Sequence, residues 1–390
     1  MLVEALDQDG ASEPGAVPPA LEWREIDLAA VRHNVRVLAA ASSPARLMVV
    51  VKADAYSHGA VQVARAALEA GASHLGVATL PEAFELRHAG VRAPLLAWLA
   101  GPGAPYGEAV ARDVELAAYG CRQLDEIADA ARSRGLTARL HLKVETGMWR
   151  GGAAKEWPAL VARARALEDD GVVQVLGVWS HLACADVADH PATEEQREAF
   201  VGAVQVAKVA GLRPRLRHLA NSAATLTRPD LHFDMVRCGL AVYGVNPLTD
   251  ARPRVELKPA VTVRARVTHV KEAPAGAAVS YGHTYRTSES TRLALVPVGY
   301  ADGIPAVPPT ARPVGYQGTS VRLAGRVCMD QLVLDVGDLP IAPGETVTLL
   351  GPGGDGEHTA EEWAELSDRS PYEMLTGLAR RRVLATYPHP

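Results

Sequence analysis

The chain has 390 residues, of which 48% are hydrophobic and 22% charged, and its formal net charge is -5. These values are typical of a soluble globular protein with one large or two medium domains. They give no electrostatic footprint for nucleic-acid binding. Residues 1–20 are acidic, contain Gly, Ser and Pro, and lack an apolar core, so we expect a disordered tail and neither a secretory signal nor a membrane span.

The cysteines are widely separated and form no CxxC pair, at Cys121, Cys184, Cys238 and Cys328. This spacing predicts reduced thiols and gives no support for a zinc site, so we expect no metal and a cytoplasmic location.

Residues 21–245 alternate between short apolar strands and helical stretches. EWREIDLAAVRHNVRVLAAAS predicts a short strand followed by an amphipathic helix with Asp27 as its N-cap. Eight further strands are expected at Leu47–Lys52, Leu75–Thr79, Leu95–Leu99, Glu115–Tyr119, Ala138–Val144, Val173–Ser180, Leu216–Ala220 and Met235–Arg237. Eight strand–helix repeats predict an α/β fold, a (β/α)8 TIM-type barrel. A doubly wound sheet is the alternative, but no GxGxxG motif follows the first strand.

Residues 246–390 have a different texture. Pro247, Pro253 and Pro259 interrupt a linker, after which segments such as AVTVRARVTHVKEA and TSVRLAGRVCMDQLVLDVGD alternate polar and apolar residues. This period of two predicts a second, mainly β domain over 246–390.

Lys52 follows directly on the apolar run LMVVV, which is typical of a strand buried on both faces. A lysine at the end of a barrel strand lies at the catalytic mouth. Lysine is also scarce in this chain, at Lys52, Lys143, Lys155, Lys208, Lys258 and Lys271. A desolvated lysine can form an imine, whereas arginine cannot. The alternative is a lysine that merely caps the strand in solvent.

Other side chains able to contact a ligand follow the ends of the later strands: Tyr56, Lys143, Met148, Trp149, Arg150, His181, Asn221, Ser222, Arg237 and Gly239. A single histidine at such a place is more often structural than catalytic. Together, however, the amine, the flat imidazole, the arginine and the small polar residues suit an aldehyde-bearing aromatic ring with a phosphate.

The motifs that carry these residues resemble those of the alanine racemase family, the fold-type III pyridoxal phosphate (PLP) enzymes. The resemblance extends from Glu25 to Tyr387 in the family's order, through VVVKADAYSHG, KVETGMWRGG, WSHLACAD, HLANSAATL, VRCGLAVYG, VSYGHTY, VPVGYADG, GRVCMDQ and SPYEMLTG. It implies a barrel with a β domain, bound PLP, and a head-to-tail homodimer that interconverts L- and D-alanine by a two-base mechanism.

By this resemblance, Lys52 holds the cofactor covalently and is one catalytic base, and Tyr281 of the other subunit is the second base. The remaining cofactor contacts match Tyr56, His181, Asn221, Ser222, Arg237, Gly239, Leu240 and Tyr372. Arg150 and Met329 match positions that hold the substrate carboxylate. Lys143 matches a lysine that is often carbamylated, and a carbamate could orient Arg150. An unmodified Lys143 that points elsewhere is the alternative.

Three other functions remain to be weighed. Fold-type III decarboxylases present a glutamate to the ring nitrogen, where this chain has Arg237, and single-barrel PLP carriers lack a second domain. A racemase for another amino acid, such as serine, is the third. Ser57, Trp149 and Ala306 depart from the family pattern, which usually has glycine, a small or polar residue, and arginine there. Trp149 could narrow the pocket or pack outward.

Overall fold

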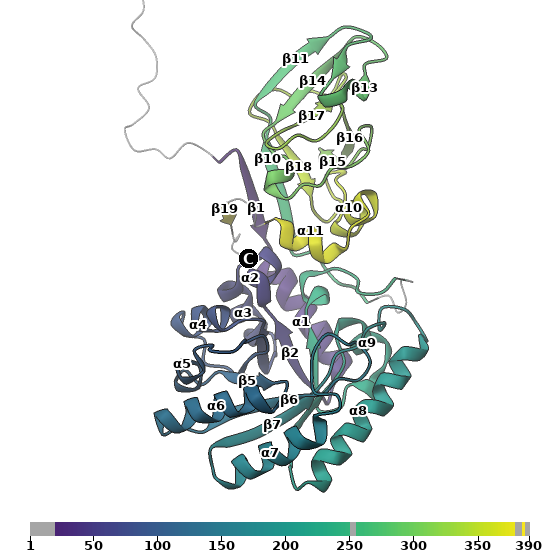
Figure 1. Ribbon diagram of the computed structural model, residues 1–390. Coiled ribbons are helices and arrows are strands. Elements are labelled where there is room, and N and C mark those ends of the chain that lie inside the picture. Colours follow the sequence, from purple (N-terminus) through teal and green to yellow (C-terminus); the bar gives the residue numbers. More distant parts are fainter. Residues whose placement is uncertain (1–19, 250–254, 379–383, 387–390) are drawn as a thin grey trace, which may run out of the picture.

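The computed structural model describes residues 20–249, 255–378 and 384–386. It has two parts, an α/β barrel and an elongated β domain that stands on one end of it (Figure 1). The tail expected at residues 1–20 lies outside the described residues, apart from residue 20. Among the described helices, none combines the length and the apolar character needed to cross a bilayer.

Eight parallel strands form the barrel, in the order β8-β7-β6-β5-β4-β3-β2-β9. Their bounds are β2 (Arg46–Val50), β3 (His74–Val77), β4 (Leu95–Ala97), β5 (Glu115–Ala118), β6 (Ala138–Lys143), β7 (Val173–Trp179), β8 (Leu216–His218) and β9 (Met235–Cys238). The backbone N–H groups of Asp234 and Arg237 donate to the carbonyls of Arg217 and Ala220, at 3.1 and 3.0 Å, which nearly closes the barrel between β8 and β9. The predicted TIM-type barrel is confirmed.

The helices that cover the barrel are α1 (Leu28–Ser42), α3 (Ala60–Glu69), α4 (Leu80–His88), α5 (Tyr106–Ala111), α6 (Cys121–Arg134), α7 (Trp157–Asp169), α8 (Pro191–Val209) and α9 (Ser222–Thr227). The predicted cap is present at α1, because the Asp27 carboxylate accepts hydrogen bonds from the N–H groups of Ala29 and Ala30.

A nine-stranded sheet forms the second domain, in the order β11-β14-β17-β16-β15-β18-β10-β1-β19. Its strands are β1 (Glu22–Ile26), β10 (Val261–Arg266), β11 (His269–Ala273), β14 (Thr291–Val296), β15 (Val314–Tyr316), β16 (Thr319–Leu323), β17 (Leu332–Asp335), β18 (Thr346–Leu350) and β19 (Leu384–Thr386). A small hairpin, β12 (Ala278–Val279) and β13 (Tyr285–Arg286), and helices α10 (Ala360–Ser367) and α11 (Pro371–Gly377) complete it. The mainly β character of this domain is confirmed.

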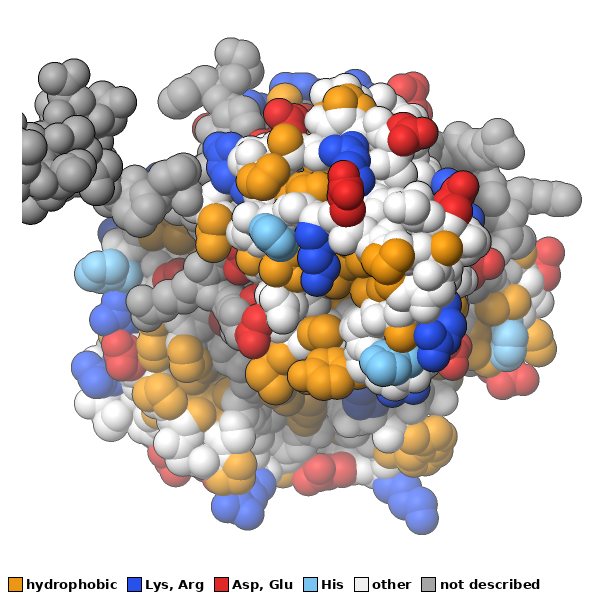
Figure 2. Space-filling model, turned by 90° about the horizontal axis from the view of Figure 1, so that it is seen from above, with side chains coloured by type: hydrophobic (Ala, Val, Ile, Leu, Met, Phe, Trp, Pro, Cys, Tyr) orange, Lys and Arg blue, Asp and Glu red, His pale blue; other side chains and the backbone are white. Residues whose placement is uncertain are grey.

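Strand β1 corrects one expectation. The range 21–245 expected for the barrel includes this strand, but β1 pairs antiparallel with β10 and parallel with β19, and with no barrel strand. The first described strand thus belongs to the sheet of the second domain, and the chain passes from it into the barrel through α1. Figure 2 looks down on the far end of this domain, where acidic and basic side chains are intermingled.

The segment after Lys52 forms a short helical turn, α2 (Lys52–Ser57), of unusual hand. Residues Ala53 to Tyr56 have φ angles of 51–53°, and Ser57 has φ 68°. Each non-glycine residue in this left-handed region costs about 1–2 kcal/mol. The turn persists because it is held from outside. Glu82 accepts a hydrogen bond from the Ala53 N–H at 2.7 Å, and Asp54 accepts one from the Ala60 N–H at 2.7 Å.

Ser57, one of the departures from the family pattern, links the two domains. It is buried, its hydroxyl donates to the Thr376 carbonyl of α11 at 3.2 Å, and its own carbonyl accepts from the Arg24 guanidinium at 2.6 Å. Serine adopts this positive φ less readily than glycine would, but its hydroxyl adds a hydrogen bond between the barrel and the β domain.

Candidate active site

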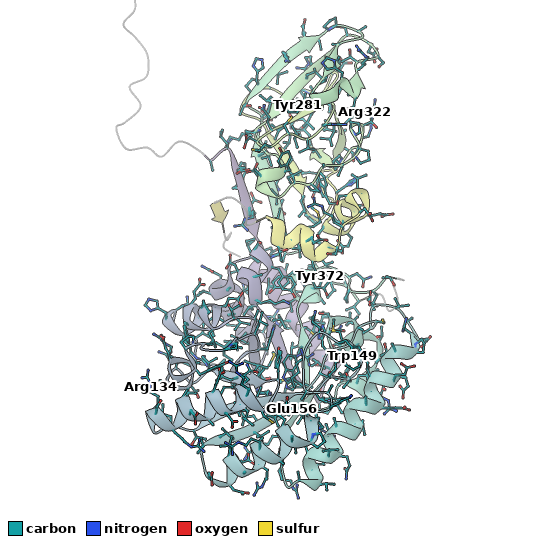
Figure 3. All side chains as sticks on the ribbon, viewed as in Figure 1. Arg134, Trp149, Glu156, Tyr281, Arg322 and Tyr372 are labelled. Atoms are coloured by element: carbon teal, nitrogen blue, oxygen red, sulfur yellow. The ribbon has the colours of Figure 1, made fainter. Side chains whose placement is uncertain are left out.

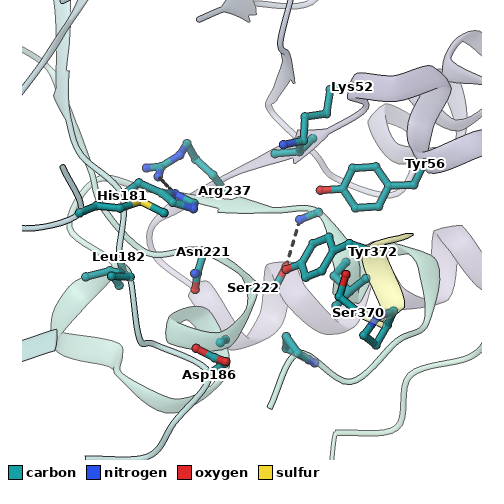
Figure 4. A pocket seen from close by; sticks show the side chains of 18 of the residues that line it. Lys52, Tyr56, His181, Leu182, Asp186, Asn221, Ser222, Arg237, Ser370 and Tyr372 are labelled. Carbon is teal, nitrogen blue, oxygen red and sulfur yellow. Dashed lines mark hydrogen bonds between the residues drawn. The ribbon is translucent and has the colours of Figure 1, made fainter. Parts of the chain in front are cut away.

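A cavity of about 1010 Å³ opens at the carboxyl ends of the barrel strands. Many of the predicted site residues line it: Lys52, Tyr56, Lys143, Arg150, His181, Asn221, Ser222, Arg237, Gly239, Leu240 and Tyr372. Figure 4 shows Tyr56, Ser222 and Tyr372 on one side, His181 and Arg237 on the other, and the Lys52 side chain between them. Helix α11 and the segment after β9 cover part of the opening, because Pro371, Tyr372 and residues 246–249 also line the cavity.

Lys52 lies at the carboxyl end of β2, where α2 begins, and its Nζ is 5.9 Å from the centre of the Trp98 ring. Burial lowers the pKa of the Lys52 amine, the Arg150 guanidinium lowers it further, and the Glu82 carboxylate opposes this shift. A larger fraction of the amine is therefore neutral near neutral pH. This is the state in which a lysine is a nucleophile or a base.

Four groups form a cradle of donors at one end of the cavity. Tyr56 is buried, stacks on Tyr243 with ring centres 4.7 Å apart, and lies 5.9 Å from the Tyr372 ring. The Gly239 N–H donates to the Ser222 hydroxyl at 3.0 Å. Burial raises the pKa of the Tyr56 hydroxyl, which therefore stays protonated. Hydroxyl and backbone N–H groups gathered in this way suit a phosphate.

The cradle requires a glycine at position 239. A Cβ built there would lie 2.5 Å from the Tyr56 hydroxyl oxygen. Gly239→Ala should therefore lower the free energy of unfolding by about 1–3 kcal/mol, as overpacking does, measured by urea denaturation. Gly202→Ala in α8 is the control, because nothing lies within 4 Å of its Cβ position and alanine favours a helix.

The double variant Gly239→Ala/Tyr56→Phe separates steric from other causes, since phenylalanine removes the atom that clashes. It should recover part of the lost stability. A double variant as unstable as the sum of the two single variants would contradict the steric explanation.

Arg237 is buried at the end of β9, on the side opposite the cradle. One terminal nitrogen donates to the Ser180 carbonyl at 2.7 Å and lies 3.2 Å from His181 Nδ1, and the other donates to the His218 carbonyl at 2.8 Å. Its Nε–H makes no hydrogen bond to any described side chain or backbone group. Burial, and after it the charge of Arg237, lowers the pKa of His181 well below its usual value, so the imidazole is neutral.

Lys143 ends β6 among aromatic rings, with its Nζ 4.8 Å from the centre of Tyr119 and 4.6 Å from that of Trp179. Burial lowers its pKa to about 8, and the nearby Arg150 and Arg237 guanidinium groups contribute to the shift. Lys143 and Arg150 thus line the same wall of the cavity as like charges.

Tyr281 and Met329 are not brought to this cavity within one chain. Both belong to the β domain, where their side chains are 72% and 52% exposed, and Figure 3 shows Tyr281 far from Tyr372 at the cavity. Trp149 is 80% exposed and does not line the cavity, so it does not narrow the pocket of its own chain. Ala306 is exposed.

Sequence reasoning missed three aromatic residues of the cavity wall, Trp98, Tyr119 and Trp179. Each lies at or just after the carboxyl end of a barrel strand, so the position that identified Lys52 could also have identified them. Trp179 packs against both of the others, with ring centres 6.2 Å from Trp98 and 6.4 Å from Tyr119.

Comparison with known proteins agrees with this geometry over nearly the whole chain. Residues 26–247 match the family model for the alanine racemase N-terminal domain, and residues 260–387 match that for the C-terminal domain. The alanine racemase of Salinispora tropica is 52% identical over 363 residues, which are 93% of this chain and 97% of that protein.

Solved structures show the same relationship. The alanine racemase of D-cycloserine-producing Streptomyces lavendulae superposes with a TM-score of 0.93 at 47% identity, covering 96% of this chain and 98% of that one. The alanine racemase of Bacillus anthracis with bound L-Ala-P gives 0.85 at 34% identity, covering 96% of each chain. With both domains matched, in sequence and in fold, this amino-acid racemase belongs to the alanine racemase family.

Proposed function

We propose that this racemase binds PLP covalently at Lys52 and interconverts L- and D-alanine, with Lys52 and Tyr281 of the partner subunit as its two bases. The observation that carries the proposal is the half-buried Lys52 amine, with its lowered pKa, between a donor cradle and the Arg237 guanidinium. The cavity fits the cofactor. The cradle of Tyr56, Ser222, Gly239 and Tyr372 suits its phosphate, and His181 offers a flat neutral ring.

Bound PLP would supply an electron sink for the carbanion that forms when the α-proton leaves. The residues of the chain then have to bind the substrate carboxylate and move protons on two faces. Arg150 is the cation of the cavity wall that is placed for the carboxylate, and Met329 of the partner subunit would adjoin it. Lys52 Nζ would exchange the proton on one face and the Tyr281 hydroxyl on the other.

Arg237 favours racemisation over decarboxylation. An acidic residue at this place would keep the pyridine nitrogen protonated and would stabilise a long-lived carbanion. Arginine is a donor only and always charged, so its free Nε–H can bond to an unprotonated nitrogen and opposes protonation. When the carbanion is short-lived, fewer substrate molecules are diverted from racemisation into side reactions such as decarboxylation.

Lys143 would act as a carbamate. The lowered pKa of its amine, about 8, leaves a substantial neutral fraction to react with dissolved CO2. Addition of CO2 to the neutral amine releases a proton and gives an anionic carbamate. This anion would replace the like-charge repulsion from Arg150 with a charge-assisted hydrogen bond that orients the guanidinium.

The site would be completed by a second subunit in a homodimer. Tyr281 and Met329 are exposed and remote from the cavity of their own chain, whereas a head-to-tail dimer would bring them to the mouth of the partner's barrel. Trp149 and Leu99, 80% and 60% exposed beside the same opening, offer apolar surface for that contact.

Mixing two inactive variants tests the shared site. Lys52→Ala and Tyr281→Phe homodimers should each be inactive, whereas a mixed dimer contains one site with both bases intact. Mixed dimers formed by unfolding and refolding an equal mixture should regain about a quarter of the parent activity, because half of the dimers are mixed and each has one of two sites. No recovery in dimers shown by mass spectrometry to be mixed would disprove sharing.

The substrate is tested with purified enzyme, added PLP and a panel of L-amino acids, with the chirality of each product read by chromatography. Alanine should be racemised fastest. Faster racemisation of serine would instead assign the chain to another substrate with the mechanism unchanged.

A further inference from the structure

A chain of buried polar side chains runs from Arg237 into the centre of the barrel, where aliphatic residues usually pack. Arg237 contacts the His218 ring at 3.3 Å through Nδ1, His218 Nε2 lies 2.9 Å from His141 Nδ1, and His141 Nε2 lies 3.0 Å from a carboxylate oxygen of Glu115. The two histidines are fully buried, and Glu115 is 3% exposed. Arg139 donates to the other carboxylate oxygen of Glu115 at 3.2 Å.

The chemistry of the two ends sets the direction of every hydrogen bond in this chain. Arginine can only donate, so His218 Nδ1 must accept, and its proton is on Nε2. His218 Nε2–H then donates to His141 Nδ1, and His141 Nε2–H donates to the Glu115 carboxylate. The reverse arrangement would place an N–H against the guanidinium and a lone pair against the carboxylate, and is unfavourable at both ends.

The backbone makes room for this chain. A Cβ on Gly177 of β7 would lie 2.4 Å from His141 Nδ1, so only glycine leaves space for the imidazole. The pairing of β6 and β7 also shifts register between Leu140 and His141, as at a β-bulge, which re-aims side chains. Buried polar groups destabilise a protein core unless all of them are hydrogen-bonded. The glycine and the register shift that make room for this chain therefore indicate a role other than stability.

Arg237 lacks a nearby counter-charge, since no carboxylate among the described residues forms an ion pair with it. Burial lowers its pKa to about 10 for this reason. Burial also raises the pKa of Glu115, but the hydrogen bond from His141 and the charges around it outweigh this, so the net shift is downward and Glu115 is an anion.

We propose that Glu115 and His141 are positioning residues that act on Arg237 through His218. Glu115 is the remote counter-anion of the guanidinium. The one-way hydrogen-bond chain fixes the rotation of Arg237, which lines the cavity and whose Nε–H has no hydrogen-bond partner among the described residues. This inference rests on the proposed PLP function, in which that N–H faces the ring nitrogen, but the proton positions it predicts do not depend on activity.

Neutron diffraction from crystals of the holoenzyme in deuterated solvent tests those positions directly. Deuterons are expected on Nε2 of both His141 and His218, with both Nδ1 atoms bare. A deuteron on His218 Nδ1 would overturn the proposal, whatever the cofactor or substrate of the enzyme.

Glu115→Gln tests the effect on the reaction, because it removes the charge and keeps the shape. It should lower kcat about tenfold or more, as loss of an outer hydrogen-bond partner does at histidine–metal sites, while KM changes less than about twofold. A less firmly held Arg237 should also raise the fraction of turnovers that end in transamination, in which the amino group of alanine would stay on the cofactor as pyridoxamine phosphate and water would release pyruvate.

Glu168→Gln is the matched control. Like Glu115, Glu168 pairs with an arginine, Arg165, and its carboxylate accepts a second hydrogen bond, from the Val175 N–H, but it does not contact the chain from Arg237. Equal losses of kcat in the two variants, or a loss in Glu115→Gln without added pyruvate, would overturn the proposal. If Glu115→Gln fails to fold, the deuteron positions on His141 and His218 of the parent enzyme still test the proposal.

Discussion

Lys52→Ala should abolish racemisation of both enantiomers. A general acid–base residue contributes roughly a hundredfold to ten-thousandfold to kcat, and the loss should be at least that large. The variant loses the covalent anchor of the cofactor as well as one of the two bases. Chiral chromatography of the product measures the activity. Borohydride reduction of the parent enzyme, followed by peptide mapping, should fix the cofactor to the peptide that contains Lys52.

Two other lysines serve as controls for this result. Lys155→Ala should retain full activity, because Lys155 is exposed and outside the cavity. Lys143 lines the same cavity as Lys52, and its pKa is also lowered. A borohydride adduct on Lys143 would reverse the roles assigned to the two residues.

Tyr281→Phe should affect the two enantiomers unequally. The variant keeps Lys52, Arg150 and the cradle, so both enantiomers should still bind. By the family resemblance the tyrosine serves L-alanine and the lysine D-alanine. Exchange of the α-proton with deuterated water, followed by NMR, should therefore be lost mainly for L-alanine, by about a hundredfold or more.

The control for this variant is another tyrosine hydroxyl of the β domain. Tyr316→Phe removes a hydroxyl that contacts Pro340 and Glu345 away from the cavity, so it should leave both exchange rates unchanged. Equal loss for both enantiomers in Tyr281→Phe, with cofactor still bound, would indicate a single base or a structural role for Tyr281.

Much of the barrel could be predicted because its strands are short apolar runs that alternate with helices. Position at a strand end identifies Lys52, His181 and Arg237 from the sequence, because parallel strands bring these ends together. The roles of Tyr281 and Met329 came from family resemblance alone, since nothing local in their sequence indicates a site.

The features that could not be predicted depend on distant partners. Strand β1 precedes a helix as a barrel strand would, but it pairs with β10, about 240 positions further along the chain, and local patterning carries no information on such pairing. The buried Glu115–His141–His218 chain was also missed. Its residues lie on three different strands, and only the closed barrel brings them into contact.

The left-handed turn from Ala53 to Tyr56 places stability and turnover in opposition. At these positions the ordinary route to a more heat-resistant protein is glycine, which adopts positive φ without a steric penalty. Glycine would also let the turn relax, and with it the spacing of Lys52 and Tyr56, which the present residues fix at the expense of strain. A library screened for melting temperature alone should therefore enrich glycine in this segment, and one screened for racemisation should remove it again.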